Sequence, residues 1–93
     1  MATTCCFFLK DPSDTIDYGM DWNQFLPPTD ALTNSEWVVP SGITMTRHRF
    51  SARAAYIWLA GGTVDTTYVL TNRITSSEGR IVERSLAILV VER

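Results

Sequence analysis

Apolar and polar residues alternate along much of this chain with a period of two. Within residues 15–22, TIDYGMDW, the apolar residues Ile16, Tyr18, Met20 and Trp22 alternate with threonine, aspartate, glycine and aspartate. Such alternation indicates a β-strand that buries one face and exposes the other to water. We therefore interpret this segment as a half-buried strand.

Six further segments have strand character and are separated by breaks that contain glycine, proline, asparagine or serine. They cover residues 3–9, 36–40, 43–50, 54–60, 67–75 and 81–91. The segment 43–50 becomes polar after Met45, which is typical of an edge strand. Residues 23–34 are expected to form a loop, because Pro27-Pro28 cannot occupy a helix interior or a central strand.

About seven short strands in 93 residues predict an all-β fold, an immunoglobulin-like β-sandwich of about seven antiparallel strands in one domain, residues 1–93. In such sandwiches a tyrosine near the start of the sixth strand ties down the preceding turn through its hydroxyl. Tyr68 follows the Gly61-Gly62 turn and fits this position, with Leu70 where a cysteine is common. The expected core includes Tyr18, Trp22, Trp37, Trp58, Tyr68, Leu70 and Ile88.

Charge and hydropathy exclude two classes of partner. Eight basic and ten acidic side chains give a net charge of −2, a poor match to nucleic acid, whose binders usually carry a clustered positive face. The longest apolar run, residues 86–91, is far shorter than the roughly 20 residues that a membrane helix needs. The N-terminus also lacks the charged and apolar regions of a secretory signal. We expect a protein made in a cytosol that binds neither nucleic acid nor membrane.

The cysteine and histidine content argues against a metal site. Cys5 and Cys6 are neighbours, and neighbouring side chains on a strand point to opposite faces, so we expect two reduced structural thiols. Together with His48 they supply only three sulfur or nitrogen ligands, whereas a structural zinc site needs four. We expect no metal and no cofactor.

Neither the acidic nor the basic residues form a catalytic pattern. The acids between Asp11 and Asp21 lack the spacing of an EF-hand calcium loop. Asp17 and Asp21 would lie roughly 13 Å apart on a strand, too far for a paired acid and base. The arginines within residues 47–53 are weak evidence for phosphate binding in an acidic chain. We therefore expect no catalytic residue and no enzyme.

The first and last strands break the alternation seen elsewhere. Residues 5–9 are apolar without interruption, and residues 86–91 are apolar on both faces. Because the first and last strands of such sandwiches commonly lie close together, their outer faces would form one apolar patch, which monomers rarely expose. We expect another subunit to cover it, with partial cover from the loop through Phe25 and Leu26 as the alternative. The expected interface residues are Phe7, Phe8, Leu9, Ala87, Leu89 and Val91.

Four stretches of the chain resemble a family of small bacteriophage tail proteins described as fibre–tail adaptor or head–tail accessory proteins. They are FLKDPSDTIDYGMDW, WVVPSGIT, IWLAGGTVDTTYVLTNRITSSEGRIVER and LAILVVER. The resemblance extends over nearly the whole chain and implies an immunoglobulin-like sandwich with a structural role in the virion. It supplies no catalytic residues.

Two functions follow from this resemblance. The first is a structural adaptor of the virion tail, made in the cytoplasm of the bacterial host, which joins the tail tube or nozzle to the fibres. Its partners would be other tail proteins and copies of itself in a ring. The alternative is a capsid-decorating or other surface-binding immunoglobulin-like module.

Overall fold

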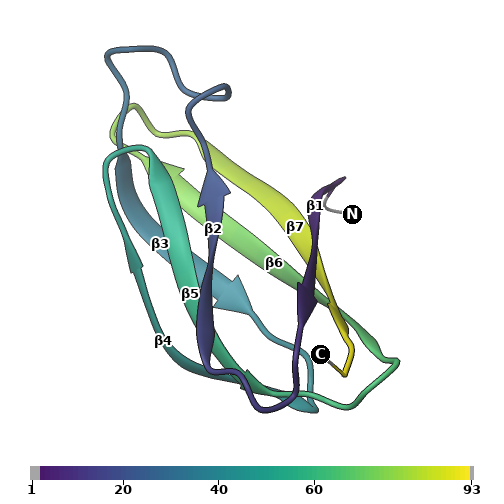
Figure 1. Ribbon diagram of the computed structural model, residues 1–93. Coiled ribbons are helices and arrows are strands. Elements are labelled where there is room, and N and C mark those ends of the chain that lie inside the picture. The colour runs from purple at the N-terminus through teal and green to yellow at the C-terminus, as the bar shows by residue number, and fades with distance from the viewer. Residues whose placement is uncertain (1–2, 93) are drawn as a thin grey trace.

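Seven strands form two sheets that pack face to face (Figure 1). The computed structural model describes residues 3–92, and these residues contain no helix. The strands are β1 (Thr3–Lys10), β2 (Ile16–Asp21), β3 (Leu32–Val38), β4 (Ile43–Phe50), β5 (Ala54–Gly61), β6 (Thr67–Ser76) and β7 (Ile81–Val90). The predicted all-β sandwich is confirmed, with β4 as the edge strand that the polar pattern of residues 43–50 indicated.

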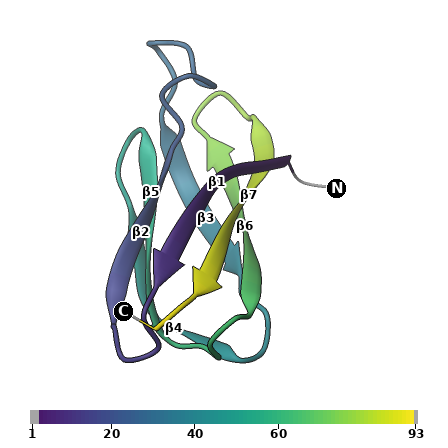
Figure 2. The ribbon, with the colours of Figure 1, turned by 45° about the vertical axis from the view of Figure 1, so that its right-hand side comes forward.

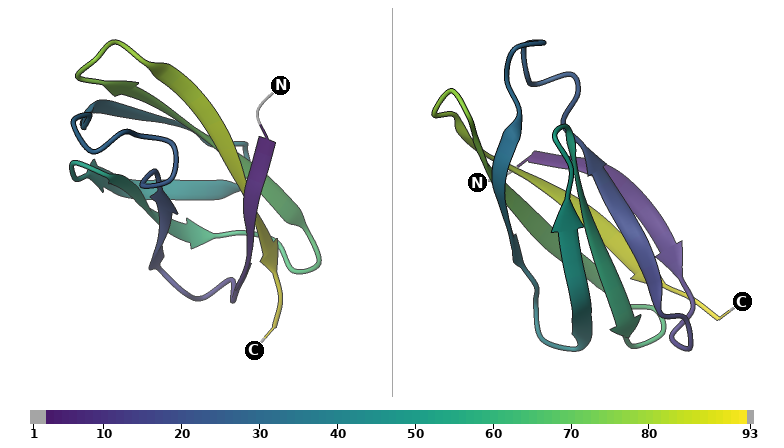
Figure 3. Two further views of the ribbon diagram at one scale, coloured as in Figure 1. Left: turned by 90° about the horizontal axis from the view of Figure 1, so that it is seen from above. Right: turned by 90° about the vertical axis from the view of Figure 1, so that its left-hand side faces the viewer.

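The two sheets have the strand orders β1-β7-β6-β3 and β2-β5-β4 (Figure 3). Every pairing is antiparallel except that of β1 with β7, which is parallel. The first and last strands therefore lie side by side and run in the same direction (Figure 2). The expectation that they are neighbours is confirmed, whereas the expectation of antiparallel strands throughout is wrong for β1.

Strand β3 begins at Leu32, earlier than the sequence predicted, so the assignment of the last part of residues 23–34 to a loop was wrong. Within residues 23–34, only Pro27 and Pro28 lack the N–H group that strand pairing needs. Residues 29–34 contain no proline, so a strand can begin among them. Leu32 is buried, and its N–H donates to the Ala52 carbonyl at 2.8 Å. Leu32 is therefore already held and buried where β3 begins.

The core lies between the sheets, where the alternating residues of β2, β5, β6 and β7 meet. Five of the seven expected core residues are buried, namely Tyr18, Trp22, Tyr68, Leu70 and Ile88. Trp37 is half-buried and packs against the rim of this core. Trp58 lies on the outer face of β5, because its neighbours Ile57 and Leu59 are fully buried on the inner face. Placing Trp58 in the core was wrong.

Tyr68 makes the turn-closing contact expected of it. The Thr63 N–H donates to the Tyr68 hydroxyl at 2.9 Å, which ties the β5–β6 turn to β6. Gly62 in this turn has a φ of 99°, a conformation that side chains disfavour. A Cβ at Gly62 would lie 2.6 Å from Val90 Cγ2, so the turn also requires the absence of a side chain.

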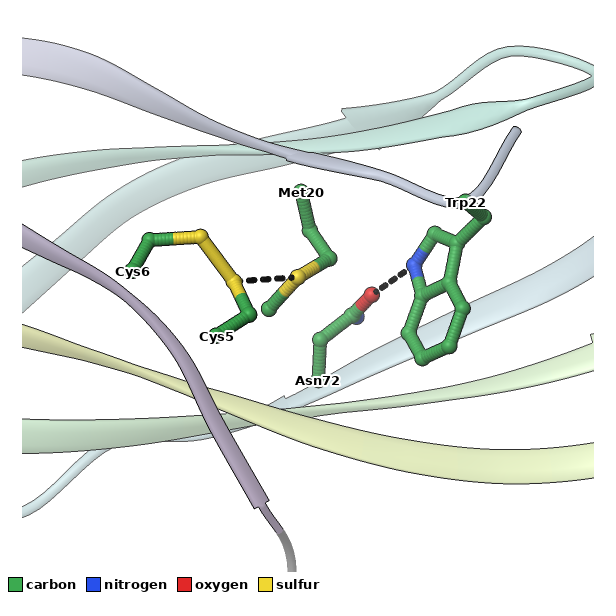
Figure 4. The surroundings of a disulfide bond; sticks show 5 residues. All are labelled: Cys5, Cys6, Met20, Trp22 and Asn72. Carbon is green, nitrogen blue, oxygen red and sulfur yellow. Dashed lines mark hydrogen bonds between the residues drawn. A yellow bond between two sulfur atoms is a disulfide. The ribbon is translucent and has the colours of Figure 1, made fainter. Parts of the chain in front are cut away.

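A buried amide joins the two sheets. The Trp22 indole N–H donates to Asn72 Oδ1 at 2.8 Å (Figure 4). The Asn72 side-chain amide donates to Ser35 Oγ and to the Glu36 carbonyl, each at 2.9 Å. Asn72 is fully buried, and these bonds remove the cost of burying a polar group.

Cys5 and Cys6 are joined by a disulfide, so the expectation of two reduced thiols was wrong (Figure 4). The strict alternation on which that expectation depended fails here, because the β1–β7 register shifts between Thr4 and Cys6. Such a bulge places an extra residue on one strand and changes the direction of its side chain. Cys5 Sγ lies 3.2 Å from the sulfur of Met20, a contact between sulfurs at the edge of the core.

Candidate interaction surfaces

Residues 3–92 contain no group of three or more His, Cys, Asp or Glu side chains that could hold a metal ion. The same residues contain no helix that is long and apolar enough to cross a membrane. His48, Asp17 and Asp21 are exposed at different places on the three-stranded sheet. The features that remain are surfaces suited to contact with other molecules.

The first surface is an apolar patch on the outer face of the four-stranded sheet. In one row across three strands, Phe7 of β1 pairs with Ala87 of β7, which pairs with Val69 of β6. In the next row Leu9 pairs with Leu89. The exposed fractions are 61% for Phe7, 46% for Leu9 and 51% for Val69. We call these five residues the apolar face.

The residues expected at an interface differ in their exposure. Phe7 and Leu9 are exposed, while Ala87 is buried. Leu89 and Val91 are half-buried. Whether these residues contact another subunit stays a prediction.

Phe8 lies on the inner side of β1, so assigning it to the outer patch was wrong. It packs against the core, with its ring centroid 5.1 Å from that of Tyr18. Alternation along β1 requires this once Phe7 and Leu9 point outward. Val69 was missed, although the buried positions of Tyr68 and Leu70 on either side of it would have predicted its exposure.

The loop before β3 lies at one end of the sandwich, at the top of Figure 1, and its two apolar side chains are engaged there. Phe25 is 43% exposed, and its ring centroid lies 5.4 Å from that of Trp22. The Arg84 guanidinium lies 4.4 Å from the same Phe25 ring. Leu26 is buried in the core. These contacts do not supply the cover for the apolar face that was considered as an alternative.

Arg53, at the turn between β4 and β5, holds this loop in place. Its guanidinium contacts Asn23 Oδ1 and donates to main-chain carbonyls of the loop. The acceptors are Asn23, Leu26, Pro27 and Asp30, at 3.1, 2.7, 3.3 and 3.0 Å. Arg53 therefore has a structural role and is separate from Arg47 and Arg49, with which the sequence grouped it.

Asp30 fixes the other side of the same loop to the β6–β7 turn. Its carboxylate accepts hydrogen bonds from Ser77 Oγ at 2.8 Å, from the Glu78 N–H at 3.0 Å and from Arg80 at 2.7 Å. Burial raises the pKa of Asp30, but the hydrogen bonds from Ser76, Ser77, Arg80 and Glu78 outweigh burial and hold that pKa well below its usual range. Asp30 is therefore ionised and bound at neutral pH.

The second surface lies on the outer face of the three-stranded sheet. The Arg47 guanidinium carbon is 4.1 Å from the centroid of the Trp58 ring, and that of Arg49 is 5.4 Å from the Tyr56 ring. In each case the arginine and the aromatic residue are direct cross-strand partners. A shallow hollow of about 470 Å³ adjoins Tyr56. Its lining residues are Gly19, Met20, Asp21, Asn23, Ser51, Arg53, Ala54 and Tyr56.

Comparison with models of protein families shows to which family this chain belongs. The model of the podophage GP4 fiber-tail adaptor protein gp77 family matches residues 10–89. The chain belongs to this family. The match spans all strands from β2 to β6 and most of β7, so it includes the second surface and Val69, Ala87 and Leu89 of the apolar face, but not Phe7 and Leu9 of β1.

This member of the adaptor family was also compared with curated protein sequences and with solved structures. The comparison with curated protein sequences gave no match. Among solved structures, the chain is similar to the solution structure of the PKD domain from KIAA 1837 protein, with a TM-score of 0.55 and 17% sequence identity over 100% of this chain and 83% of that one. At this identity the similarity concerns the fold alone, and it supports the immunoglobulin-like assignment. The family is one of structural phage adaptors, which implies a component of the virion tail.

Proposed function

We propose that this protein is a non-enzymatic adaptor that joins the tail tube or nozzle of a phage to its fibres. The observation that carries the proposal is the match of the fiber-tail adaptor family over residues 10–89. The apolar face supports it, because an adaptor must be held by its neighbours through a surface that buries apolar area. The neighbour that we propose for this face is another tail subunit.

The rigidity of the apolar face suits a protein partner. Phe7, Leu9 and Val69 project from the outer face of the sheet. The opposite face of the same strands is fixed in the core by buried residues such as Ile88 and Leu70. Side chains held on a rigid sheet lose little conformational entropy on binding, so more of the buried area contributes to affinity. Phe7 has the largest and most exposed side chain of the apolar face, so it supplies much of the area that a partner could bury.

We further infer that several copies assemble in a ring at the tail after synthesis in the cytoplasm of the bacterial host. Closed rings arise when one surface of a subunit contacts a different surface of the next. This assembly would contact neither nucleic acid nor membrane. The net charge of −2 agrees with an absence of nucleic acid binding.

The test replaces residues of the apolar face and measures incorporation into particles. Phe7→Asp and Val69→Asp change exposed side chains, so each variant is expected to fold and stay soluble while its incorporation falls at least about tenfold. Ile81→Asp is the matched control, because Ile81 is 59% exposed on β7 but lies at the far end of that strand. Its incorporation is expected to equal that of the wild type.

Quantitative composition of purified particles tests the adaptor role itself. A small closed ring at the tail predicts on the order of ten copies per particle. Hundreds of copies would favour capsid decoration and contradict the proposal. Normal incorporation of folded Phe7→Asp would show that the interface lies elsewhere.

A further inference from the structure

Strand β4 is an exposed edge of the three-stranded sheet, at the left margin of Figure 1. It pairs with β5 on one side, and within residues 3–92 no strand pairs with its other side. Six of its eight residues are exposed. Such an edge presents N–H and C=O groups to which a strand of another protein can be added. The register shift on β4 lies between Met45 and Arg47, so the part from Arg47 onward pairs regularly with β5.

Two arginines on this edge are already positioned by aromatic rings. Arg47 stacks at 4.1 Å from Trp58, and Arg49 lies 5.4 Å from Tyr56 and 5.6 Å from Trp58. Both ion pairs found within residues 3–92 involve Arg80, so neither β4 arginine is neutralised by a carboxylate there. Stacking restricts each guanidinium while its N–H groups remain able to bind an anion.

We propose that this edge binds an extended segment of a partner protein that carries acidic side chains at alternate positions. The segment would pair with β4 as an added strand, and its carboxylates would accept hydrogen bonds from Arg47 and Arg49. On a strand, residues two apart lie on the same face and roughly 6.6 Å from each other. Two acidic residues separated by one residue therefore match the spacing of the two arginines.

A second copy of this chain fits the β4 edge less well. The complementary acidic strand in this molecule is β2, the other edge of the same sheet. Its outward positions are Asp17, Gly19 and Asp21, which pair with Trp58, Tyr56 and Ala54. The two carboxylates are four residues apart with a glycine between them, so one arginine would face no acid. The spacing favours a segment of a different protein.

Single-stranded nucleic acid also fits poorly. Its binders offer aromatic faces on which bases stack, whereas the Arg47 guanidinium already stacks on the Trp58 ring. The arrangement therefore suits carboxylates spaced along a strand.

The test uses the intact chain and a capped seven-residue peptide of alternating threonine and glutamate. Nuclear magnetic resonance titration is expected to show saturable shifts centred on β4, with slower amide exchange for the β4 N–H groups that do not pair with β5. A peptide with lysine in place of glutamate is the control ligand. Raising the salt concentration should weaken binding, because the contacts are exposed ion pairs.

Variants distinguish the contribution of Arg47 and Arg49 from the effect of removing positive charge elsewhere on the protein. The double variant Arg47→Gln/Arg49→Gln should weaken binding of the glutamate peptide about tenfold. Arg73→Gln, in which the replaced arginine lies in register between Glu36 and Glu83 on the other sheet, should bind as the wild type does. All three replaced side chains are exposed, so the variants are expected to fold.

Several results would overturn the inference. They are the absence of saturable binding by the glutamate peptide, equal binding by the double variant, equal binding of the lysine peptide, and tighter binding of an oligothymidylate of similar length. Self-association of the chain that the double variant abolishes would identify a second copy as the occupant. The inference rests on the proposed adaptor role in one respect: if that role holds, the partner that carries the acidic segment is another tail protein. The peptide assay uses the isolated chain, so its failure is distinguishable from failure of the apolar-face test.

Discussion

The two ends of the sandwich are closed by different chemistry, although the same strands run between them. At the loop end, the top of Figure 1, the charged groups of Asp30 and Arg53 bind main-chain and side-chain groups of three connections. At the opposite end, which we call the corner end, the β5–β6 turn is held by the neutral Tyr68 hydroxyl and by the close packing of Gly62 on Val90. A charged group also contacts this turn, because the buried Lys10 ammonium donates to the Gly61 carbonyl at 2.7 Å. The comparison teaches that a network of charged side chains holds the loop end, whereas the corner end depends on close packing and a neutral hydroxyl beside the Lys10 ammonium.

The largest effect is expected from Gly62→Ala at the corner end. The left-handed conformation of Gly62 penalises a side chain by about 1–2 kcal/mol, and overpacking against Val90 adds about 1–3 kcal/mol. Gly61→Ala is the matched control, because Gly61 also has a positive φ of 77° but a Cβ there would have no atom within 4 Å. It should cost only about 1–2 kcal/mol. Urea unfolding measures both, and equal losses would show that shape does not control this end.

Ionisation of Asp30 is expected to have the second largest effect, confined to the loop end. Its pKa in the folded protein is lower than the ordinary value of 3.8, so the folded state favours the carboxylate. The stabilisation is therefore fully present above that value and is lost as the pH falls below it toward the folded pKa. Asp30→Asn should destabilise the protein at neutral pH and reduce the further loss of stability in acid.

Amide exchange shows where the effect of Asp30 acts. In Asp30→Asn, exchange of the Glu78 and Ala31 N–H groups should accelerate, because both donate to the carboxylate in the wild type. Exchange of the Thr63 N–H at the corner end should change only as much as global stability does. An equal local acceleration at Thr63 would contradict the separation of the two ends.

The smallest effect is expected from Tyr68→Phe. It removes one hydrogen bond, from the Thr63 N–H, and should cost about 1 kcal/mol in the free energy of unfolding. Tyr56→Phe is the control, because Tyr56 is half-buried on the outer face of β5. Thermal unfolding that shows no difference between the two variants would remove the structural role assigned to the Tyr68 hydroxyl.

Alternation and turn residues were sufficient to predict the seven strands apart from the start of β3. The direction of side chains was predictable only where one face of a strand is polar. In β2 the polar partners of Tyr18 and Met20 show which side faces water. Trp58 and Phe8 lie in segments that are apolar on both faces, so their sides follow from the neighbouring strands and not from local pattern. Both were misplaced for this reason.

The polar contacts that close the molecule could not be predicted from local sequence, because their partners are distant along the chain. Asn72 and Trp22 are separated by 50 residues, as are Arg80 and Asp30. The bulge that permits the Cys5–Cys6 disulfide is likewise a property of the β1–β7 register. The exposed residues of the apolar face were partly predictable, since Phe7 and Leu9 belong to an apolar run, residues 5–9, that is too long to be buried on one face alone.

The parallel pairing of β1 with β7 has a mechanical consequence for a member of an adaptor family. Both strands run toward the same end, so tension applied between residue 3 and residue 92 pulls β1 and β7 in opposite directions along their length (Figure 2). The hydrogen bonds between them, extended by that from the Val91 N–H to the Lys10 carbonyl at 2.8 Å, then carry the load together in shear. An antiparallel pair loaded at one end would instead open one bond at a time. We therefore expect this seam to resist stretching along the direction of the strands.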